Sequence, residues 1–168
     1  ATRAEVGVAA RLLGGQGGVR FGAEFTQAAV LRGGLGEARV VHLATHALLP
    51  GELSCLSEPS LMVSPPRGAP DASGAFIPAS TLLGLRLDAD LVILSACNTG
   101  STPGGAGAGG EGLAGLARAF FFAGTRGILA THWAVDDLAA ALLVAGTLER
   151  ERGGATAAAA LRGAQLRL

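Results

Sequence analysis

One cysteine and one histidine, far apart in the sequence, occupy positions where each could take part in chemistry. Cys97 comes shortly after the apolar residues 91–94, in an expected strand at residues 91–95, and leads into the turn-forming residues "NTG". His46 follows a second apolar stretch, "VVHLA", at residues 40–44. A thiol has an ordinary pKa of about 8.5, so it attacks well at neutral pH only beside a base or a positive charge. A histidine can supply that base and later protonate a leaving amine.

The elements that must position these two residues follow from hydrophobic patterning and from glycine, proline and capping residues. Thr26 and Asp136 are suited to cap helices. The helices expected are at residues 5–13, 27–32, 80–85, 113–123, 136–150 and 155–166. The strands expected are at residues 19–21, 40–44, 61–63, 75–77, 91–95 and 127–131.

Apolar strands separated by helices predict an α/β fold with a parallel sheet covered on both sides. Right-handed crossovers bring the carboxyl ends of such strands to one edge, where ligands bind. The residues expected to gather at that edge are His46, Cys97, His132, Trp133, Asp136 and Asp137. Backbone N–H groups of Ala47 and Cys97 could hold a developing oxyanion there. The alternative is that Cys97 is a small core residue at the end of a strand, and the spacing alone leaves both interpretations open.

Four segments together resemble successive motifs of the CHAT domain: "VVHLATHA", "DADLVILSACNTG", "GEGLAGLARAFFFAGTRGILATHWAVDD" and the terminal "AAALRGAQLRL". CHAT domains are caspase-like cysteine peptidases, often fused to tetratricopeptide repeats and similar in fold to caspases, separase and gingipains. The resemblance covers nearly the whole chain. It implies a caspase-like three-layer α/β fold, with a mostly parallel sheet between helices and without the family's first strand. It also implies that His46 is the catalytic histidine and Cys97 the nucleophile.

We therefore interpret residues 1–168 as a CHAT domain taken from a longer chain, with a regulatory helical-repeat region upstream. The expected function is a cysteine endopeptidase acting on a protein or peptide substrate. The alternative is an inactive caspase-like module that binds other proteins. Three residues depart from the family's usual pattern: Ala47 replaces a common glycine, Asn98 a frequent glutamate, and His132 an apolar residue.

The segment "HWAVDD" resembles the motif with which separase lines its primary specificity pocket with an aspartate. Asp136 is better placed as a helix N-cap, which leaves Asp137 to face the pocket, with Trp133 and His132 lining it. A carboxylate there would pair with a guanidinium and favour cleavage after arginine. The alternative is that Asp137 is a solvated acid in the first turn of the helix.

Charge and composition argue against several other classes of function. The net charge is zero and the 13 basic residues, all arginine, are spread along the chain. This argues against nucleic acid or an acidic membrane surface as a partner. The most apolar region, residues 113–135, is interrupted by Arg118 and Arg126, so no membrane span is expected. Two cysteines without a secretory leader indicate a reducing cytoplasm.

No cofactor or metal is expected. A zinc site made of His46, Cys97 and His132 is conceivable, but no Cys-x-x-Cys or His-x-x-x-His spacing supports it. The glycine-rich stretch at residues 99–112 lacks the ending of a phosphate-binding loop. Cys55 lies in a polar loop and is interpreted as incidental. His42 lies within a strand and is interpreted as a packed, hydrogen-bonded core residue.

Overall fold

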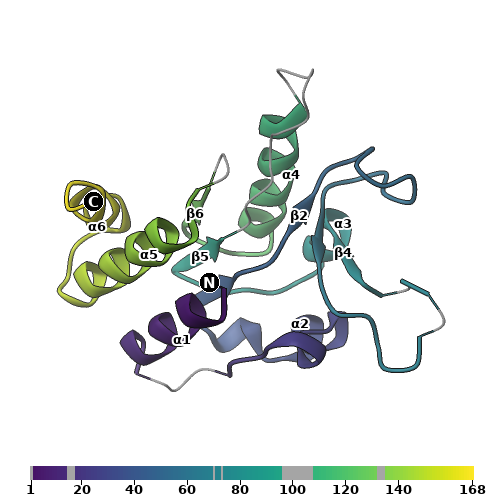
Figure 1. Ribbon diagram of the computed structural model, residues 1–168, viewed down its shortest axis with the longest axis horizontal. Helices are drawn as coiled ribbons and strands as arrows, with labels where there is room; N and C mark the ends of the chain where they lie inside the picture. Colours follow the sequence, from purple (N-terminus) through teal and green to yellow (C-terminus); the bar gives the residue numbers. More distant parts are fainter. Residues whose placement is uncertain (1, 15–17, 70, 73, 96–107, 132–134) are drawn as a thin grey trace. The chain divides into compact units, whose positions relative to one another are not determined.

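The computed structural model describes residues 2–14, 18–69, 71–72, 74–95, 108–131 and 135–168 (Figure 1). The chain divides into two compact units. One consists of Ala1–Val19 with Val135–Leu168, and the other of Arg20–Ala134. The second unit contains all the strands and is described first.

Three parallel strands form the sheet on which the candidate site is built. They are β1 (Val40–Leu43), β5 (Leu91–Leu94) and β6 (Ile128–Ala130), with β5 in the middle (Figure 1). Val40 lies opposite Leu91, and Val92 opposite Ile128. All four residues of β5 are buried, as expected for a central parallel strand covered on both faces. The predicted parallel sheet is therefore confirmed.

The second sheet is antiparallel, and its first strand begins shortly after β1 ends. It consists of β2 (Ala47–Leu48), β3 (Ser60–Met62) and β4 (Phe76–Pro78) in the order β2-β3-β4. The strands predicted at residues 61–63 and 75–77 correspond to β3 and β4, while β2 was not predicted. A strand of two residues carries too little alternation to be recognised from its own sequence.

Short helices and one long helix complete this unit. They are η1 (Gly22–Glu24), α2 (Gln27–Arg32), η2 (Leu35–Glu37), α3 (Ala79–Leu82) and α4 (Ala108–Phe122). The Thr26 side chain accepts a hydrogen bond from the Ala29 N–H at 3.2 Å, so the predicted cap of α2 is confirmed. One apolar core joins both sheets to α3 and α4. Its largest fully buried members are Phe120, Leu61, Ile77, Leu82, Leu94 and Leu116.

The other unit consists of three helices. They are α1 (Thr2–Leu12), α5 (Asp137–Arg152) and α6 (Ala157–Gln165). Asp136 is the N-cap of α5, and its carboxylate accepts hydrogen bonds from the N–H groups of Leu138 at 2.9 Å and Ala139 at 3.1 Å. The predicted role of Asp136 is therefore confirmed. Gly146 of α5 lies against Ala164 of α6, which lets the two helices approach closely.

Two predictions about local structure need correction. The strand expected at residues 19–21 is absent: these residues have no regular structure and lead into η1. Gly22 has a φ of +51°, which ends the extended conformation directly after residue 21. The helix expected at residues 113–123 begins earlier, at Ala108, and so includes glycines that intrinsically disfavour a helix.

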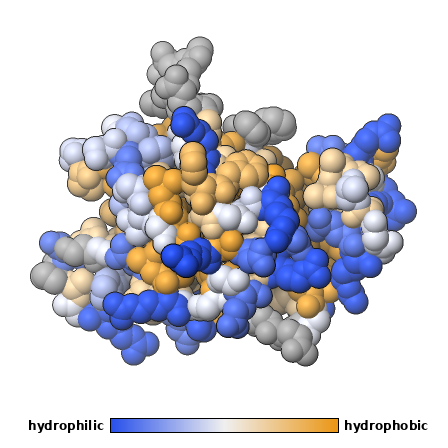
Figure 2. All heavy atoms as spheres, turned by 180° about the vertical axis from the view of Figure 1, so that it is seen from behind, coloured by the Kyte–Doolittle hydropathy of each residue, from blue (hydrophilic) through white to orange (hydrophobic). Residues whose placement is uncertain are grey.

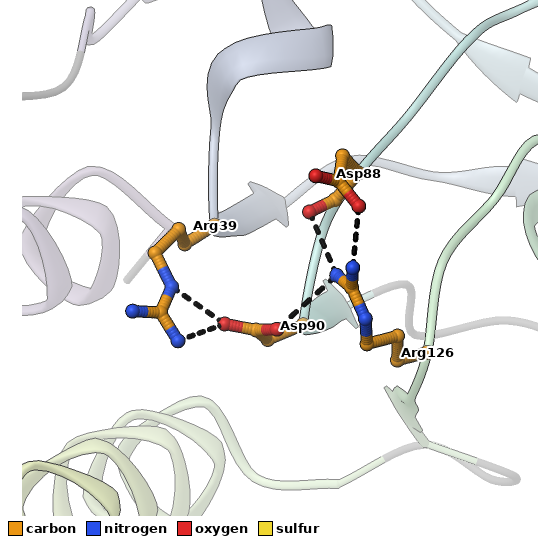
Figure 3. Close-up of polar contacts among 4 residues, drawn as sticks. All are labelled: Arg39, Asp88, Asp90 and Arg126. Atoms are coloured by element: carbon orange, nitrogen blue, oxygen red, sulfur yellow. Dashed lines mark hydrogen bonds and ion pairs between the residues drawn. The ribbon is translucent and has the colours of Figure 1, made fainter.

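Charged residues cluster where the three parallel strands begin (Figure 3). Arg39 precedes β1, Asp90 precedes β5, and Arg126 lies two residues before β6. The Arg39 Nε donates to Asp90 at 2.6 Å, and Arg126 pairs with both Asp90 and Asp88. This ion-pair network therefore occupies the amino edge of the sheet, opposite the edge where β1 leads to His46.

The surface mixes polar and apolar side chains. Figure 2 shows hydrophilic residues on several separate parts of the face it draws, with hydrophobic residues between them. Phe121 and Phe122, in the last turn of α4, are among the exposed large apolar residues. No helix within the described ranges is both long and apolar enough to cross a membrane.

Candidate functional site

His46 lies in the short connection between β1 and β2, and its side chain is exposed. Two hydrogen bonds to Met62 of β3 hold this connection in place. The His46 carbonyl accepts from the Met62 N–H at 2.8 Å, and the Thr45 hydroxyl donates to the Met62 carbonyl at 2.6 Å. A solvent-accessible imidazole is thus carried on a firmly held backbone at the carboxyl end of a parallel strand.

Ala47, expected to donate its N–H to an oxyanion, is the first residue of β2, and it is buried. Antiparallel strands alternate between hydrogen-bonded and non-bonded pairs. Because His46 and Met62 form a bonded pair, Ala47 and Leu61 form a non-bonded pair, and the Ala47 N–H points away from β3. No described residue other than glycine has a positive φ, so alanine fits this backbone without strain. The departure from the family's glycine therefore does not disturb the local geometry.

Cys97 lies outside the described residues, but the strand that leads to it is described as far as Ser95. The Ser95 N–H donates to the Leu43 carbonyl at 3.1 Å, which continues the pairing of β5 with β1. The Ser95 hydroxyl oxygen also lies 3.1 Å from His42 Nε2, at hydrogen-bonding distance. The strand that leads to Cys97 is therefore bonded, up to two residues before the cysteine, to the strand that leads to His46.

Helix α4, which includes the end of the glycine-rich stretch, packs against the segment that follows His46. A Cβ atom added at Gly112 would lie only 1.8 Å from Leu49 Cδ2, and one at Gly115 would lie 3.1 Å from Pro59 Cγ. Leu49 is buried. The glycines of α4 thus allow a close contact that larger residues would prevent, and this contact explains why the helix forms despite them.

The other predicted site residues are only partly described. His132 and Trp133 lie outside the described residues. Asp137 is the first residue of α5, directly after the N-cap Asp136, and the placement of its side chain is not described. The structure therefore does not test whether these residues line a substrate pocket.

Among the residues that the structure describes, no group of three histidine, cysteine or acidic side chains could hold a metal ion. The conceivable zinc site includes Cys97 and His132, which lie outside those residues. Cys55 is exposed and carries a free thiol. His42 is hydrogen-bonded, as predicted, but it is half-buried and does not belong to the buried core.

Sequence reasoning missed two contacts that support the site. The first is the bond between His42 and Ser95; the parallel register, once known, places both residues on one face of the sheet. The second is the contact of Leu49 with Gly112, for which the only sequence signal was the glycine spacing in "GEGLAGLA". Both depend on pairings between segments more than 50 residues apart, which local patterns do not reveal.

Comparison with known proteins agrees with this architecture. The family model of the CHAT domain matches residues 1–168, the whole chain. No curated protein and no solved structure gave a match. The mixed α/β fold, with a parallel three-stranded sheet and helices, is compatible with a caspase-like fold. The chain therefore belongs to the CHAT domain family, whose domains are of the caspase-like peptidase type.

Proposed function

We propose that this chain is a cysteine endopeptidase that hydrolyses protein or peptide substrates with Cys97 as nucleophile and His46 as general base and acid. One observation carries the proposal. β1 and β5 are adjacent and parallel, and they remain bonded as far as Leu43 and Ser95. The residues that follow these two strands therefore emerge from neighbouring positions at one sheet edge. His46 comes three residues after Leu43, and Cys97 comes two residues after Ser95.

The proposed reaction uses only these side chains and the backbone. His46 takes the thiol proton, and the Cys97 Sγ attacks the carbonyl carbon of the scissile peptide bond. The carbonyl oxygen then carries a negative charge, which backbone N–H groups of Ala47 and Cys97 would stabilise. His46 gives the proton to the leaving amine, and a thioester forms. Water, deprotonated by His46, then hydrolyses the thioester and releases the carboxylate product with the free thiol.

We further propose that Asp137 selects an arginine side chain directly before the scissile bond. The support is the confirmed N-cap role of Asp136, which satisfies the first N–H groups of α5. Capping of α5 therefore does not require the carboxylate of Asp137. A carboxylate pairs with a guanidinium through two parallel hydrogen bonds, a geometry that lysine reproduces less well.

The test is cleavage of a fluorogenic peptide with arginine before the leaving group. Cys97→Ala and His46→Ala should each abolish cleavage and leave the far-UV circular dichroism spectrum unchanged. Cys55→Ala is the matched control, because it removes the chain's other thiol and should retain full activity. Equal cleavage by the Cys97→Ala protein would refute the proposed mechanism.

A covalent label separates this proposal from the alternative of an inactive binding module. An arginyl acyloxymethyl ketone should add its peptidyl mass to Cys97 and not to Cys55, as read by peptide mass spectrometry. A folded chain that neither cleaves peptides nor takes up the label would favour the binding module.

In the full-length protein we expect an upstream helical-repeat region to regulate the peptidase.

A further inference from the structure

The hydrogen bond between His42 and Ser95 joins two strands at the point where each one leads to a proposed catalytic residue. It links His42 Nε2 to the Ser95 hydroxyl oxygen at 3.1 Å, and either atom can be the donor, depending on the tautomer of the imidazole. His42 lies four residues before His46, and Ser95 lies two residues before Cys97. This bond thus joins the two segments a few residues before each proposed catalytic residue.

This bond lies on one face of the parallel sheet, and the apolar core that joins the two sheets lies against the other face. Side chains alternate between the two faces of a strand, so Val41 and Leu43 share one face with Val92 and Leu94. These four residues belong to the apolar core. His42 lies on the other face of the sheet, in register with Ile93. Ser95, two residues after Ile93, lies on the same face as His42. The pair is therefore a diagonal cross-strand pair.

Main-chain bonds alone leave the ends of two parallel strands free to move, because the ladder stops there. The last described bond of this ladder joins the Ser95 N–H to the Leu43 carbonyl. The His42 side chain of β1 forms a second bond to Ser95, this time to its hydroxyl group. Ser95 is thus held at both its backbone and its side chain, whereas apolar residues at the two positions would leave only the backbone bond.

We propose that His42 and Ser95 are positioning residues, which fix the distance between the proposed His46 base and the Cys97 thiol. This inference rests on the proposed function, because it assigns the pair a role in that reaction. Misplacing reacting groups by about 1 Å can lower a rate by about a hundredfold. The contribution of one hydrogen bond is smaller than this hundredfold effect on the rate. Its loss should therefore lower kcat by about tenfold, with KM nearly unchanged.

Matched variants separate this role from a general contribution to stability. Ser95→Ala and His42→Leu remove the bond, while Ser95→Thr retains the hydroxyl and His42→Gln places an amide near the position of Nε2. Ser64→Ala removes a different hydroxyl bond, the 2.7 Å bond to the Gly22 carbonyl, and serves as the control. Ser95→Ala and His42→Leu should lose activity. Ser95→Thr and His42→Gln should retain most of it, and Ser64→Ala should be fully active. The double variant Ser95→Ala/His42→Leu should lose no more activity than the worse single variant, because one bond is removed in all three.

A second measurement does not require peptide cleavage. In a Cys55→Ala background Cys97 is the only thiol, so its alkylation by iodoacetamide can be followed as a function of pH. If His46 activates Cys97, His46→Ala should slow alkylation at pH 6.5 and leave the rate at pH 10 unchanged. Ser95→Ala and His42→Leu should do the same to a smaller extent, by about threefold to tenfold at pH 6.5.

The outcomes distinguish the two proposals. If His46→Ala does not alter the pH profile of alkylation, the proposed dyad fails and the positioning role fails with it. If His46→Ala alters the profile but neither Ser95→Ala nor His42→Leu does, only the positioning role is refuted. An altered profile in all three variants of a chain that cleaves no peptide would refute the peptidase and retain the positioning role.

Discussion

Replacing Gly112 by alanine should destabilise the protein, although alanine is the better helix former. Gly112 lies in α4, and an added Cβ would lie 1.8 Å from Leu49 Cδ2. Carbon atoms in contact are separated by about 3.5 Å, so the Leu49 side chain would have to withdraw by roughly 1.7 Å. Leu49 is buried, which limits that withdrawal.

Two opposing effects set the magnitude. Alanine in place of glycine within a helix stabilises by up to about 1 kcal/mol. Overpacking a well-packed site costs about 1–3 kcal/mol. The steric cost is therefore the larger effect, and we expect Gly112→Ala to lower the free energy of unfolding by about 1 kcal/mol. The Leu49 segment follows His46, so a loss of peptidase activity should accompany the loss of stability.

Urea unfolding followed by circular dichroism measures this change, and two further variants test its cause. Gly7→Ala in α1 is the matched control, because its Cβ would meet nothing closer than an Arg11 side-chain nitrogen at 3.8 Å; it should stabilise the protein. Leu49→Ala removes the atoms that clash, so adding Gly112→Ala to that variant should be neutral or stabilising. A destabilising effect of Gly112→Ala that persists in the Leu49→Ala background would show that the clash is not the cause.

Three further predictions address the caps, the charges and the specificity. Asp136→Ala should lower the free energy of unfolding by about 0.5–2 kcal/mol in urea, whereas Asp136→Asn should retain most of the cap. Arg126→Met should cost less than about 1 kcal/mol and leave kcat unchanged, because its ion pairs are exposed; a large loss of either would contradict this. Asp137→Ala should raise KM for arginyl peptides and reduce the preference for arginine in a peptide library. An unchanged preference would refute the proposed role of Asp137.

The parallel sheet could be predicted because its strands have a strong sequence pattern. "LVIL" in β5 is apolar throughout, and it is buried on both faces. The N-caps Thr26 and Asp136 were also predictable, because the oxygen of one short polar side chain can accept from the free N–H groups at the start of a helix. These features depend on residues close together in the sequence, and the structure bears them out.

Features that depend on distant pairing could not be predicted in the same way. β2 has only two residues, and it exists because β3 pairs with it after a long connection. Helix α4 starts five residues earlier than its pattern suggested, and Gly112, in the added part, fits against Leu49 from a distant segment. Val19 and Phe21, on either side of Arg20, suggested a short strand, but the positive φ of Gly22 turns the chain away. Distant contacts therefore account for β2 and accompany the early start of α4, whereas a local backbone conformation accounts for the missing strand at 19–21.

The two edges of the parallel sheet are stabilised by different kinds of interaction, and this difference bears on function. At the amino edge, exposed ion pairs join the segments that enter all three strands (Figure 3). Such pairs contribute little free energy and weaken with salt, so changes there should affect the chemistry little. At the carboxyl edge, the half-buried hydrogen bond between His42 and Ser95 joins β1 to the residue that follows β5. Because the proposed positioning role ties this bond to the two proposed catalytic residues, changes at the carboxyl edge should lower kcat more than changes at the amino edge.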